Sequence, residues 1–146
     1  MKDDLKEKSM KSSRLVFSSL VTFFFLAGVY NLNASAQSSR DWVDQALGNY
    51  QSRILSAGNL VSGRTEFRKT REGFLEGSYT MDEQREVVPG TLSQCKAMQV
   101  RVMRCVWNDK YGTGNLEVTF SENFSGFNGY WGEGSLEPVF RWSGSR

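Results

Sequence analysis

A dense mixture of aromatic residues and glycines near the C-terminal end constrains this chain more than any other feature. The fifteen residues from Phe120 to Gly134 contain five aromatic residues and four glycines. Glycine inside a strand weakens it unless the backbone must bend or approach a neighbour closely, and a small curved barrel needs such points repeatedly. An aromatic ring from a neighbouring strand can cover the gap that each glycine leaves. The stretch therefore predicts part of the wall of a small β-barrel.

The same combination recurs along the chain at spacings typical of short strands. Four glycines lie inside strand-like patterns, each with an aromatic residue nearby: Gly77 with Tyr79, Gly126 with Phe127, Gly129 with Trp131 and Gly144 with Trp142. Alternation predicts strands over residues 73–81, 98–107 and 116–120. Turn-forming residues predict turns at residues 57–59, 82–84, 89–90, 108–115, 122–123 and 132–135. We expect an all-β fold, a small antiparallel up-and-down barrel or meander of roughly seven to eight strands.

Residues 1–36 have the pattern of a cleaved secretory signal peptide. Basic residues dominate the start, an apolar block runs from Leu15 to Tyr30, and Ala34-Ser35-Ala36 matches the small-x-small cleavage pattern. The alternative is an uncleaved membrane anchor, but the block is shorter than the ~20 residues that a spanning helix needs. We expect a secreted or periplasmic protein that begins near Gln37 and keeps no stable membrane anchor after cleavage.

A short helix is predicted between the leader and the barrel, over residues 37–47. Apolar residues at positions 42, 43, 46 and 47 share one helical face, Ser39 can cap the start, and Gly48 can end the helix. Residues 48–146 then form the barrel domain.

Charge and histidine content exclude several functional classes. The net charge of +2 comes entirely from residues 1–36, where five basic residues face three acidic ones, so the mature domain has no electrostatic footprint for nucleic acid. The chain has no histidine, which removes Ser-His-Asp and Cys-His nucleophile systems and His-ligated zinc. We expect a non-enzymatic protein with no cofactor and no metal site.

The two cysteines, Cys95 and Cys105, are an even pair in a chain expected to be exported, where disulfides persist. A fully extended segment would separate their Cα atoms by roughly 33 Å, whereas a bridge needs about 5.5 to 6 Å. An intramolecular disulfide therefore requires the chain to fold back, with residues 93–97 as a turn or short helical piece against the following strand. Reduced thiols in the core and an intermolecular bridge are the alternatives.

Several short motifs give the barrel segment a recognisable rhythm. They run over residues 48–50, 75–79, 90–92, 105–107, 114–120, 127–131 and 142–146. The rhythm resembles a loose group of small exported bacterial β-barrel proteins, rich in glycine and aromatic residues, that end in F-x-G-x-W and W-x-G-x-R. That group is distantly similar to the avidin and lipocalin style of barrel. The resemblance implies export and a barrel fold, and it carries no activity.

Aromatic residues are the candidates for ligand binding, because their flat faces bury large areas at low entropic cost. The candidates are Trp107, Tyr111, Phe124, Phe127, Tyr130, Trp131 and Trp142. Period-two alternation puts Phe124 with Tyr130 on one face and Phe127 with Trp131 on the other, and only one pair can face the core. We expect a site for a small apolar or sugar-like ligand.

Three alternatives to a ligand site remain open. The protein could attach to a protein partner through an exposed aromatic face. It could also be a hydrolase that uses two carboxylates, with Glu133 and Glu137 or Asp109 and Glu117 as the pairs that the sequence offers. The rings could instead simply fill the barrel.

Overall fold

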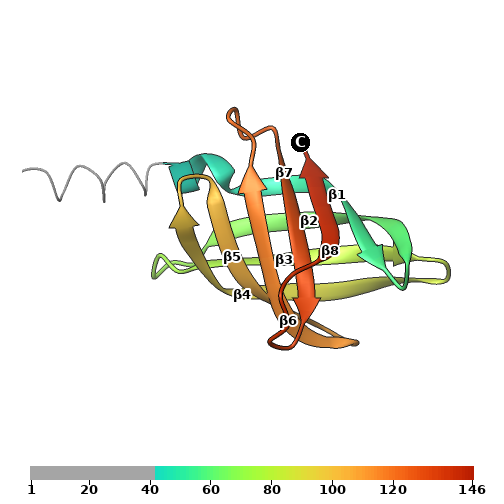
Figure 1. Cartoon of the computed structure of the whole chain (residues 1–146). Coiled ribbons are helices and arrows are strands. Elements are labelled where there is room, and N and C mark those ends of the chain that lie inside the picture. Colours follow the sequence, from blue (N-terminus) through green and yellow to red (C-terminus); the bar gives the residue numbers. More distant parts are fainter. Residues whose placement is uncertain (1–41) are drawn as a thin grey trace, which may run out of the picture. The chain divides into compact units, whose positions relative to one another are not determined.

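The computed structural model describes residues 42–146, which form an antiparallel β-barrel (Figure 1). Within residues 42–146, eight strands follow one another. They are β1 (Gly48–Ser56), β2 (Asn59–Lys69), β3 (Leu75–Glu83), β4 (Glu86–Gln99), β5 (Val102–Asp109), β6 (Gly112–Phe120), β7 (Gly126–Glu133) and β8 (Phe140–Ser145).

Each strand pairs with the next, and β8 pairs with β1 to close the barrel. This up-and-down order confirms the predicted all-β barrel with a short helix near the N-terminus. Residues 42–46 are helical and precede β1. The rest of the helix predicted over residues 37–47, and the leader predicted over residues 1–36, lie outside the described residues.

Alternation along each strand separates the interior from the outer wall. In β5, Met103, Cys105 and Trp107 are buried, whereas Arg104 and Asn108 between and beyond them are exposed. A side chain at every second residue therefore points into the barrel.

Glycines on neighbouring strands make room for the inward-pointing rings, as the sequence pattern indicated. The Tyr79 ring lies over Gly90, where an added Cβ would be only 2.1 Å from Cζ of the ring. The Phe127 ring lies over Gly144, where an added Cβ would be 2.3 Å from Cε1. The backbone of one strand thus forms part of the surface on which a ring from the next strand rests.

The helix covers one end of the barrel, which we call the capped end (Figure 1). Arg146 ties this end together, because its Nη2 donates hydrogen bonds to the carbonyl oxygens of Gln45 (2.9 Å) and Leu47 (2.6 Å). Its guanidinium also lies 4.8 Å from the centre of the Tyr50 ring, and the Tyr50 hydroxyl donates to the carbonyl of Ala46 (2.8 Å). The last residue of the chain therefore holds the helix on the barrel.

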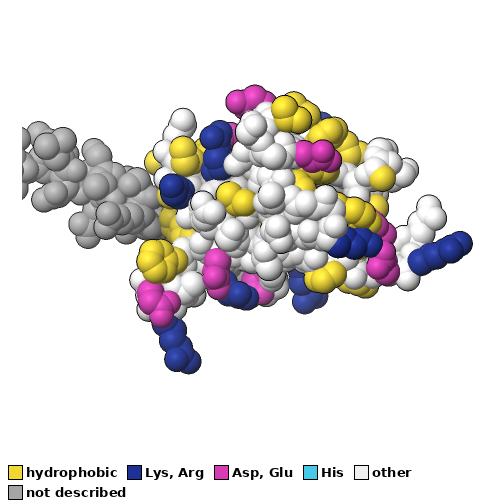
Figure 2. Space-filling view, turned by 90° about the horizontal axis from the view of Figure 1, so that it is seen from below, with side chains coloured by type: hydrophobic (Ala, Val, Ile, Leu, Met, Phe, Trp, Pro, Cys, Tyr) yellow, Lys and Arg dark blue, Asp and Glu magenta, His cyan; other side chains and the backbone are white. Residues whose placement is uncertain are grey.

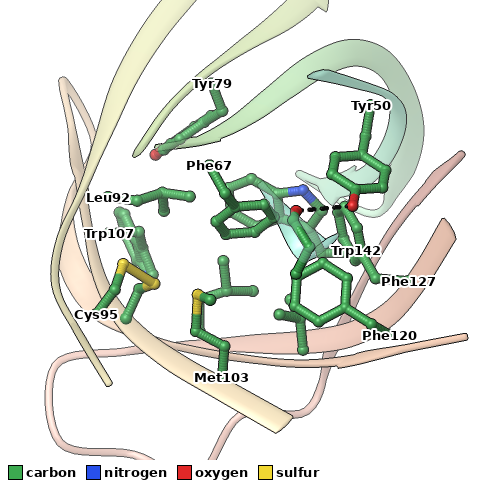
Figure 3. Close-up of a cluster of buried hydrophobic side chains, with 14 of the residues drawn as sticks. Tyr50, Phe67, Tyr79, Leu92, Cys95, Met103, Trp107, Phe120, Phe127 and Trp142 are labelled. Carbon is green, nitrogen blue, oxygen red and sulfur yellow. Dashed lines mark hydrogen bonds between the residues drawn. A yellow bond between two sulfur atoms is a disulfide. The ribbon is translucent and has the colours of Figure 1, made fainter. Parts of the chain in front are cut away.

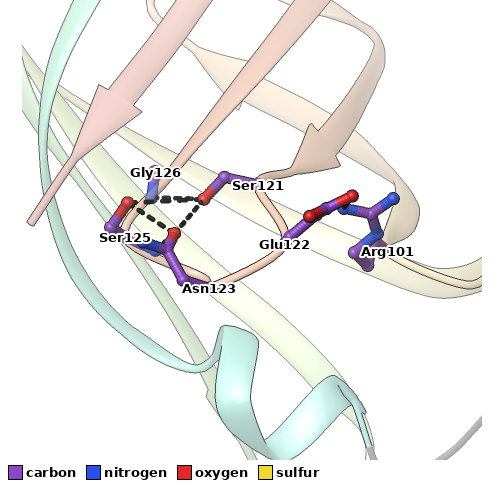
Figure 4. A network of polar contacts seen from close by, with 6 residues as sticks. All are labelled: Arg101, Ser121, Glu122, Asn123, Ser125 and Gly126. Atoms are coloured by element: carbon purple, nitrogen blue, oxygen red, sulfur yellow. Dashed lines mark hydrogen bonds and ion pairs between the residues drawn. The ribbon is translucent and has the colours of Figure 1, made fainter.

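The turn between β6 and β7 is fixed by side-chain hydrogen bonds at the capped end (Figure 4). Asn123 Oδ1 accepts hydrogen bonds from the hydroxyls of Ser121 (3.0 Å) and Ser125 (2.7 Å) and from the backbone N–H of Ser125 (3.1 Å). The turn places Phe124, with a φ of +54°, under the helix, where its ring stacks on Trp42. Phe124 is buried. These polar contacts have a structural role.

Strand parity in the Phe120–Gly134 stretch is resolved by this turn. Phe127 and Trp131 point into the barrel, as one of the two predicted pairs should. Tyr130 points outward and is 47 % exposed. The predicted pairing of Phe124 with Tyr130 on one strand face is wrong, because Phe124 lies in the turn before β7 begins.

A disulfide joins Cys95 in β4 to Cys105 in β5 (Figure 3). The β4–β5 register shifts between Ser93 and Lys96, and Gln94 in this bulge has a φ of +51°. The extra residue resets the alternation so that Cys95 points inward beside Cys105, and both are buried.

Two predictions about this region are wrong. Residues 93–97 belong to β4 rather than to a turn or helical piece, and the strand predicted over residues 98–107 is interrupted. The fold-back is a tight turn at Val100 and Arg101, where Arg101 has a φ of +64°. Neither residue is a typical turn former, so composition did not reveal the turn.

The turn predicted at Pro89-Gly90 is also wrong, because both residues lie inside β4. The pairing of β4 with β5 begins only at Thr91, so Pro89 lies where β4 pairs with β3 alone. A proline is tolerated in such a half-paired segment because its missing N–H breaks no ladder on the free side. The turn predicted at residues 108–115 is shorter than expected, since β5 continues to Asp109 and β6 begins at Gly112.

The outer wall is mixed in character. On the face shown in Figure 2, hydrophobic side chains lie in several separate groups, and basic side chains extend from both ends. No helix within residues 42–146 is long and apolar enough to cross a membrane.

Candidate functional site

A cavity of about 770 Å³ occupies the end of the barrel opposite the helix, which we call the open end. Aromatic and aliphatic side chains form its walls: Ile54, Val61, Tyr79, Met81, Trp107, Trp131 and Trp142. Polar side chains from the strand ends and the turns surround its mouth: Ser56, Asn59, Asp82, Glu83, Gln84, Arg85, Glu86, Asp109, Tyr111 and Glu133. The cavity is thus apolar inside and polar at its entrance.

The rings in the walls pack two by two and leave space between the pairs. Trp107 and Trp131 meet edge to face, with their centroids 5.3 Å apart. Tyr79 and Trp142 meet in the same way at 4.6 Å. Trp131 also contacts Phe140 at the start of β8, at 4.7 Å. Edge-to-face packing fixes the orientation of each ring.

The three indole N–H groups in the walls are all used by the protein itself. Trp107 Nε1 donates to the carbonyl oxygen of Gly132, and Trp131 Nε1 donates to that of Leu55, both at 3.0 Å. Trp142 Nε1 donates to Thr65 Oγ1 at 3.0 Å. The tryptophans therefore present apolar faces to the cavity and keep their donors for the barrel.

The Tyr79 hydroxyl links the wall to the mouth. Its ring crosses β4 over Gly90, so the hydroxyl on β3 reaches β5 and donates a 2.7 Å hydrogen bond to Asp109 Oδ2. Burial, and then the hydrogen bond to Asp109 and its charge, raise the pKa of Tyr79 far above its usual range. Tyr79 therefore stays protonated and acts as a donor. Asp109 also accepts from the backbone N–H of Tyr111 (2.8 Å).

Negative charge is concentrated at the mouth. Five carboxylates and one guanidinium line the cavity. Glu83 accepts hydrogen bonds from the hydroxyls of Tyr111 and Ser56, the latter at 2.9 Å. The bond from Tyr111, helped by Ser56 and the nearby Lys110 charge, lowers the pKa of Glu83 despite some desolvation. Glu83 is therefore ionised at neutral pH.

The structure divides the seven predicted ligand residues between three places. Trp107, Tyr111, Trp131 and Trp142 line the cavity. Phe124 and Phe127 are buried at the capped end. Tyr130 lies on the outer wall, opposite Glu117 on β6 and Arg141 on β8 in the strand register.

Sequence reasoning missed Tyr79, Glu83 and Glu86 as cavity residues, and it considered Asp109 and Glu133 only as members of hydrolytic carboxylate pairs. Strand parity contained the signal, because Asp109 follows the inward-facing Trp107 by two residues. In the same way Glu83 follows Tyr79 and Met81 at steps of two. Extending each alternating strand to its end would have placed these carboxylates around the opening.

The structure does not bring together Asp109 and Glu117, one of the carboxylate pairs considered for hydrolysis. Asp109 faces the cavity, whereas Glu117 lies on the outer wall in an ion pair with Arg104 (2.7 Å). Glu133 lines the cavity, and Glu137 lies in the β7–β8 loop outside that lining. Within residues 42–146, no group of three His, Cys, Asp or Glu side chains is placed to hold a metal ion.

No protein-family model, curated protein or solved structure matches this chain. The geometry of the cavity is therefore the main evidence for function.

Proposed function

We propose that this chain is an exported, non-enzymatic binding protein that takes a small, mainly apolar ligand into the open end of its barrel. The observation that carries the proposal is the aromatic-lined cavity of about 770 Å³. Sites for small molecules are typically concave, about 300 to 1,000 Å³ in volume, and lined by apolar groups with a few polar ones. The described walls and mouth fit that description.

Export is supported by two independent features. Residues 1–36 carry the leader pattern, and the Cys95–Cys105 disulfide suits an oxidising compartment. N-terminal sequencing of the exported protein should give a start near Gln37. A start far from that position would contradict cleavage at Ala36.

Native mass spectrometry of the protein purified from its own source tests ligand binding directly. We expect a small molecule that co-purifies in a one-to-one ratio. Ser56→Trp should abolish this species, because Ser56 lies at the mouth and a tryptophan there would obstruct the opening. Ser62→Trp is the matched control, since Ser62 is exposed on the outer side of β2.

Two results would argue against the cavity. A co-purifying molecule that survives Ser56→Trp binds elsewhere. A retained second protein, with no small molecule in repeated preparations, would favour the alternative of a surface interaction protein. That alternative has less support, because the exposed Tyr130 has charged neighbours on both sides rather than further rings.

A further inference from the structure

Four carboxylates lie at the mouth of the cavity, next to its apolar walls. Asp109 and Glu133 each come two residues after an inward-facing tryptophan, and Glu83 pairs in register with Glu86 across β3 and β4. All four line the cavity. Because alternate residues share a face, these side chains extend the inner surface rather than the outer wall.

Only part of this negative charge is compensated. Lys110 forms an ion pair with Glu86, the one ion pair at the open end among residues 42–146. Glu83 and Asp109 accept hydrogen bonds from neutral donors, namely hydroxyls and a backbone N–H. Neutral donors hold a carboxylate in place without cancelling its charge.

The polar chemistry that remains for a ligand is mainly acceptor chemistry, although Gln84 and Arg85 in the lining of the mouth can also donate. The indole N–H groups and the Tyr79 hydroxyl are already engaged within the barrel. The faces of the tryptophan rings are negative because of their π-electrons, so they favour the same sign of ligand charge as the carboxylates do. A cation is attracted both by an indole face and by a carboxylate, and the attraction is strongest where water is excluded.

We propose that the ligand of this cavity is a small organic cation, an amine or quaternary ammonium carried on an apolar or aromatic body. The body lies among Trp107, Trp131 and Trp142, and the charged group lies at the mouth against Asp109, Glu83 and Glu133. This inference rests on the proposed function that the cavity binds a small molecule. It disfavours anionic amphiphiles, which the mouth repels, and sugars, whose many acceptors would find few free donors.

Three probes that share one apolar body test the charge of the ligand. They are naphthalen-1-ylmethylamine, naphthalen-1-ylmethanol and naphthalene-1-carboxylate, titrated into the mature protein by isothermal calorimetry at pH 7. We expect the amine to bind about tenfold more tightly than the alcohol, with the carboxylate weakest. The preference for the amine should shrink as salt is added, because the mouth is open to solvent.

A pair of triple variants locates the preference. Glu83→Gln, Asp109→Asn and Glu133→Gln together keep the side-chain shapes of the mouth and one acceptor oxygen on each side chain, and they should make the amine and the alcohol bind equally. Glu66→Gln, Glu76→Gln and Glu117→Gln together remove the same total charge from the outer wall and should leave the preference unchanged. Far-ultraviolet circular dichroism confirms that both variants are folded.

The outcomes separate this inference from the proposed function. If the alcohol binds as tightly as the amine and Ser56→Trp blocks both, the cavity binds ligands but selects no cation, and the inference fails alone. A preference that survives in the mouth variant would also overturn it. If none of the three probes binds at millimolar concentration, the proposed function fails as well.

Discussion

The two ends of this barrel use the same kinds of residue for different purposes. At the capped end, Tyr50, Phe67, Phe120 and Phe127 all contact one another, with ring centroids between 5.2 and 6.0 Å apart (Figure 3). At the open end, the rings pair two by two and surround a cavity. Aromatic rings therefore fill the capped end of the barrel, whereas at the open end they line a cavity.

The difference arises from what the strand ends carry beyond the rings. Past the filled layer lies the helix, whose Trp42 packs on Phe120 and Phe124 and closes the end. Past the lined layer lie carboxylates, which are charged and cannot be buried together without a partner. Glycine and aromatic density therefore specifies a barrel, and the charge at the strand ends decides which end stays open.

The largest expected effect comes from replacing one phenylalanine at each end of the barrel by alanine. Phe120→Ala should lower the free energy of unfolding by about 3 to 5 kcal/mol, because it opens a hole in the filled layer. Phe140→Ala, at the open end where the side chain is 39 % exposed, should cost under about 1 kcal/mol. Urea unfolding followed by tryptophan fluorescence measures both. Equal losses would mean that the open end is packed as tightly as the capped end.

The contact between the C-terminal residue and the helix is the next test. Arg146→Ala removes the hydrogen bonds to the carbonyls of Gln45 and Leu47 and the contact with the Tyr50 ring, so we expect a loss of about 1 to 2 kcal/mol. Arg141→Ala, exposed in β8, should change the free energy of unfolding by under about 0.5 kcal/mol. If the two variants unfold alike in urea, Arg146 does not hold the cap.

The sequence was sufficient for the fold because its signals are local and repeated. Alternation and in-strand glycines each recur in several strands. The incorrect prediction of turns at Pro89-Gly90 and residues 93–97 therefore did not change the predicted architecture. The site was harder to predict. Trp107 and Trp131 line a cavity while Phe127, with the same inward parity, fills the core, and only the position along the barrel axis separates them. That position depends on register, which the bulge at Gln94 shifts.

The dependence of stability on alkaline pH allows one buried tyrosine at each end of the barrel to be compared. Burial raises the pKa of both Tyr50 and Tyr79, but the Arg146 charge opposes the rise at Tyr50, whereas Asp109 adds to it at Tyr79. Above pH ~10 an unfolded tyrosine releases its proton and a folded Tyr79 does not, so the unfolded chain binds fewer protons and stability falls as pH rises.

The expected loss attributable to Tyr79 is at most about 1.4 kcal/mol per pH unit between pH 10 and 11.5. Tyr79→Phe should reduce the slope of unfolding free energy against pH more than Tyr50→Phe does, measured by urea titrations across that range. Only slopes are compared, because each substitution also removes a hydrogen bond at neutral pH. A steeper contribution from Tyr50 would show that the charges of Arg146 and Asp109 do not distinguish the two ends.

Each end also has a buried indole N–H, and the two differ in their hydrogen bonding. Trp142 donates to Thr65, whereas Trp42 Nε1 is buried without an acceptor among residues 42–146. Replacing either by phenylalanine removes the same volume, so the difference between the two costs reports the hydrogen bond. Trp142→Phe should cost about 1 to 2 kcal/mol more than Trp42→Phe, because the latter also removes a buried unpaired donor.

Urea unfolding of the two tryptophan variants gives this difference directly. The result bears on the contrast between the ends, since a wall around a cavity must fix each ring by a specific bond, while a filled core holds its rings by mutual contact. Trp42 fits the second case, because among the described residues 42–146 it has two aromatic neighbours and no acceptor for its N–H. If Trp42→Phe proves the more costly change, hydrogen bonding does not separate the lined end from the filled one, and the open cavity must depend on its backbone and carboxylates alone.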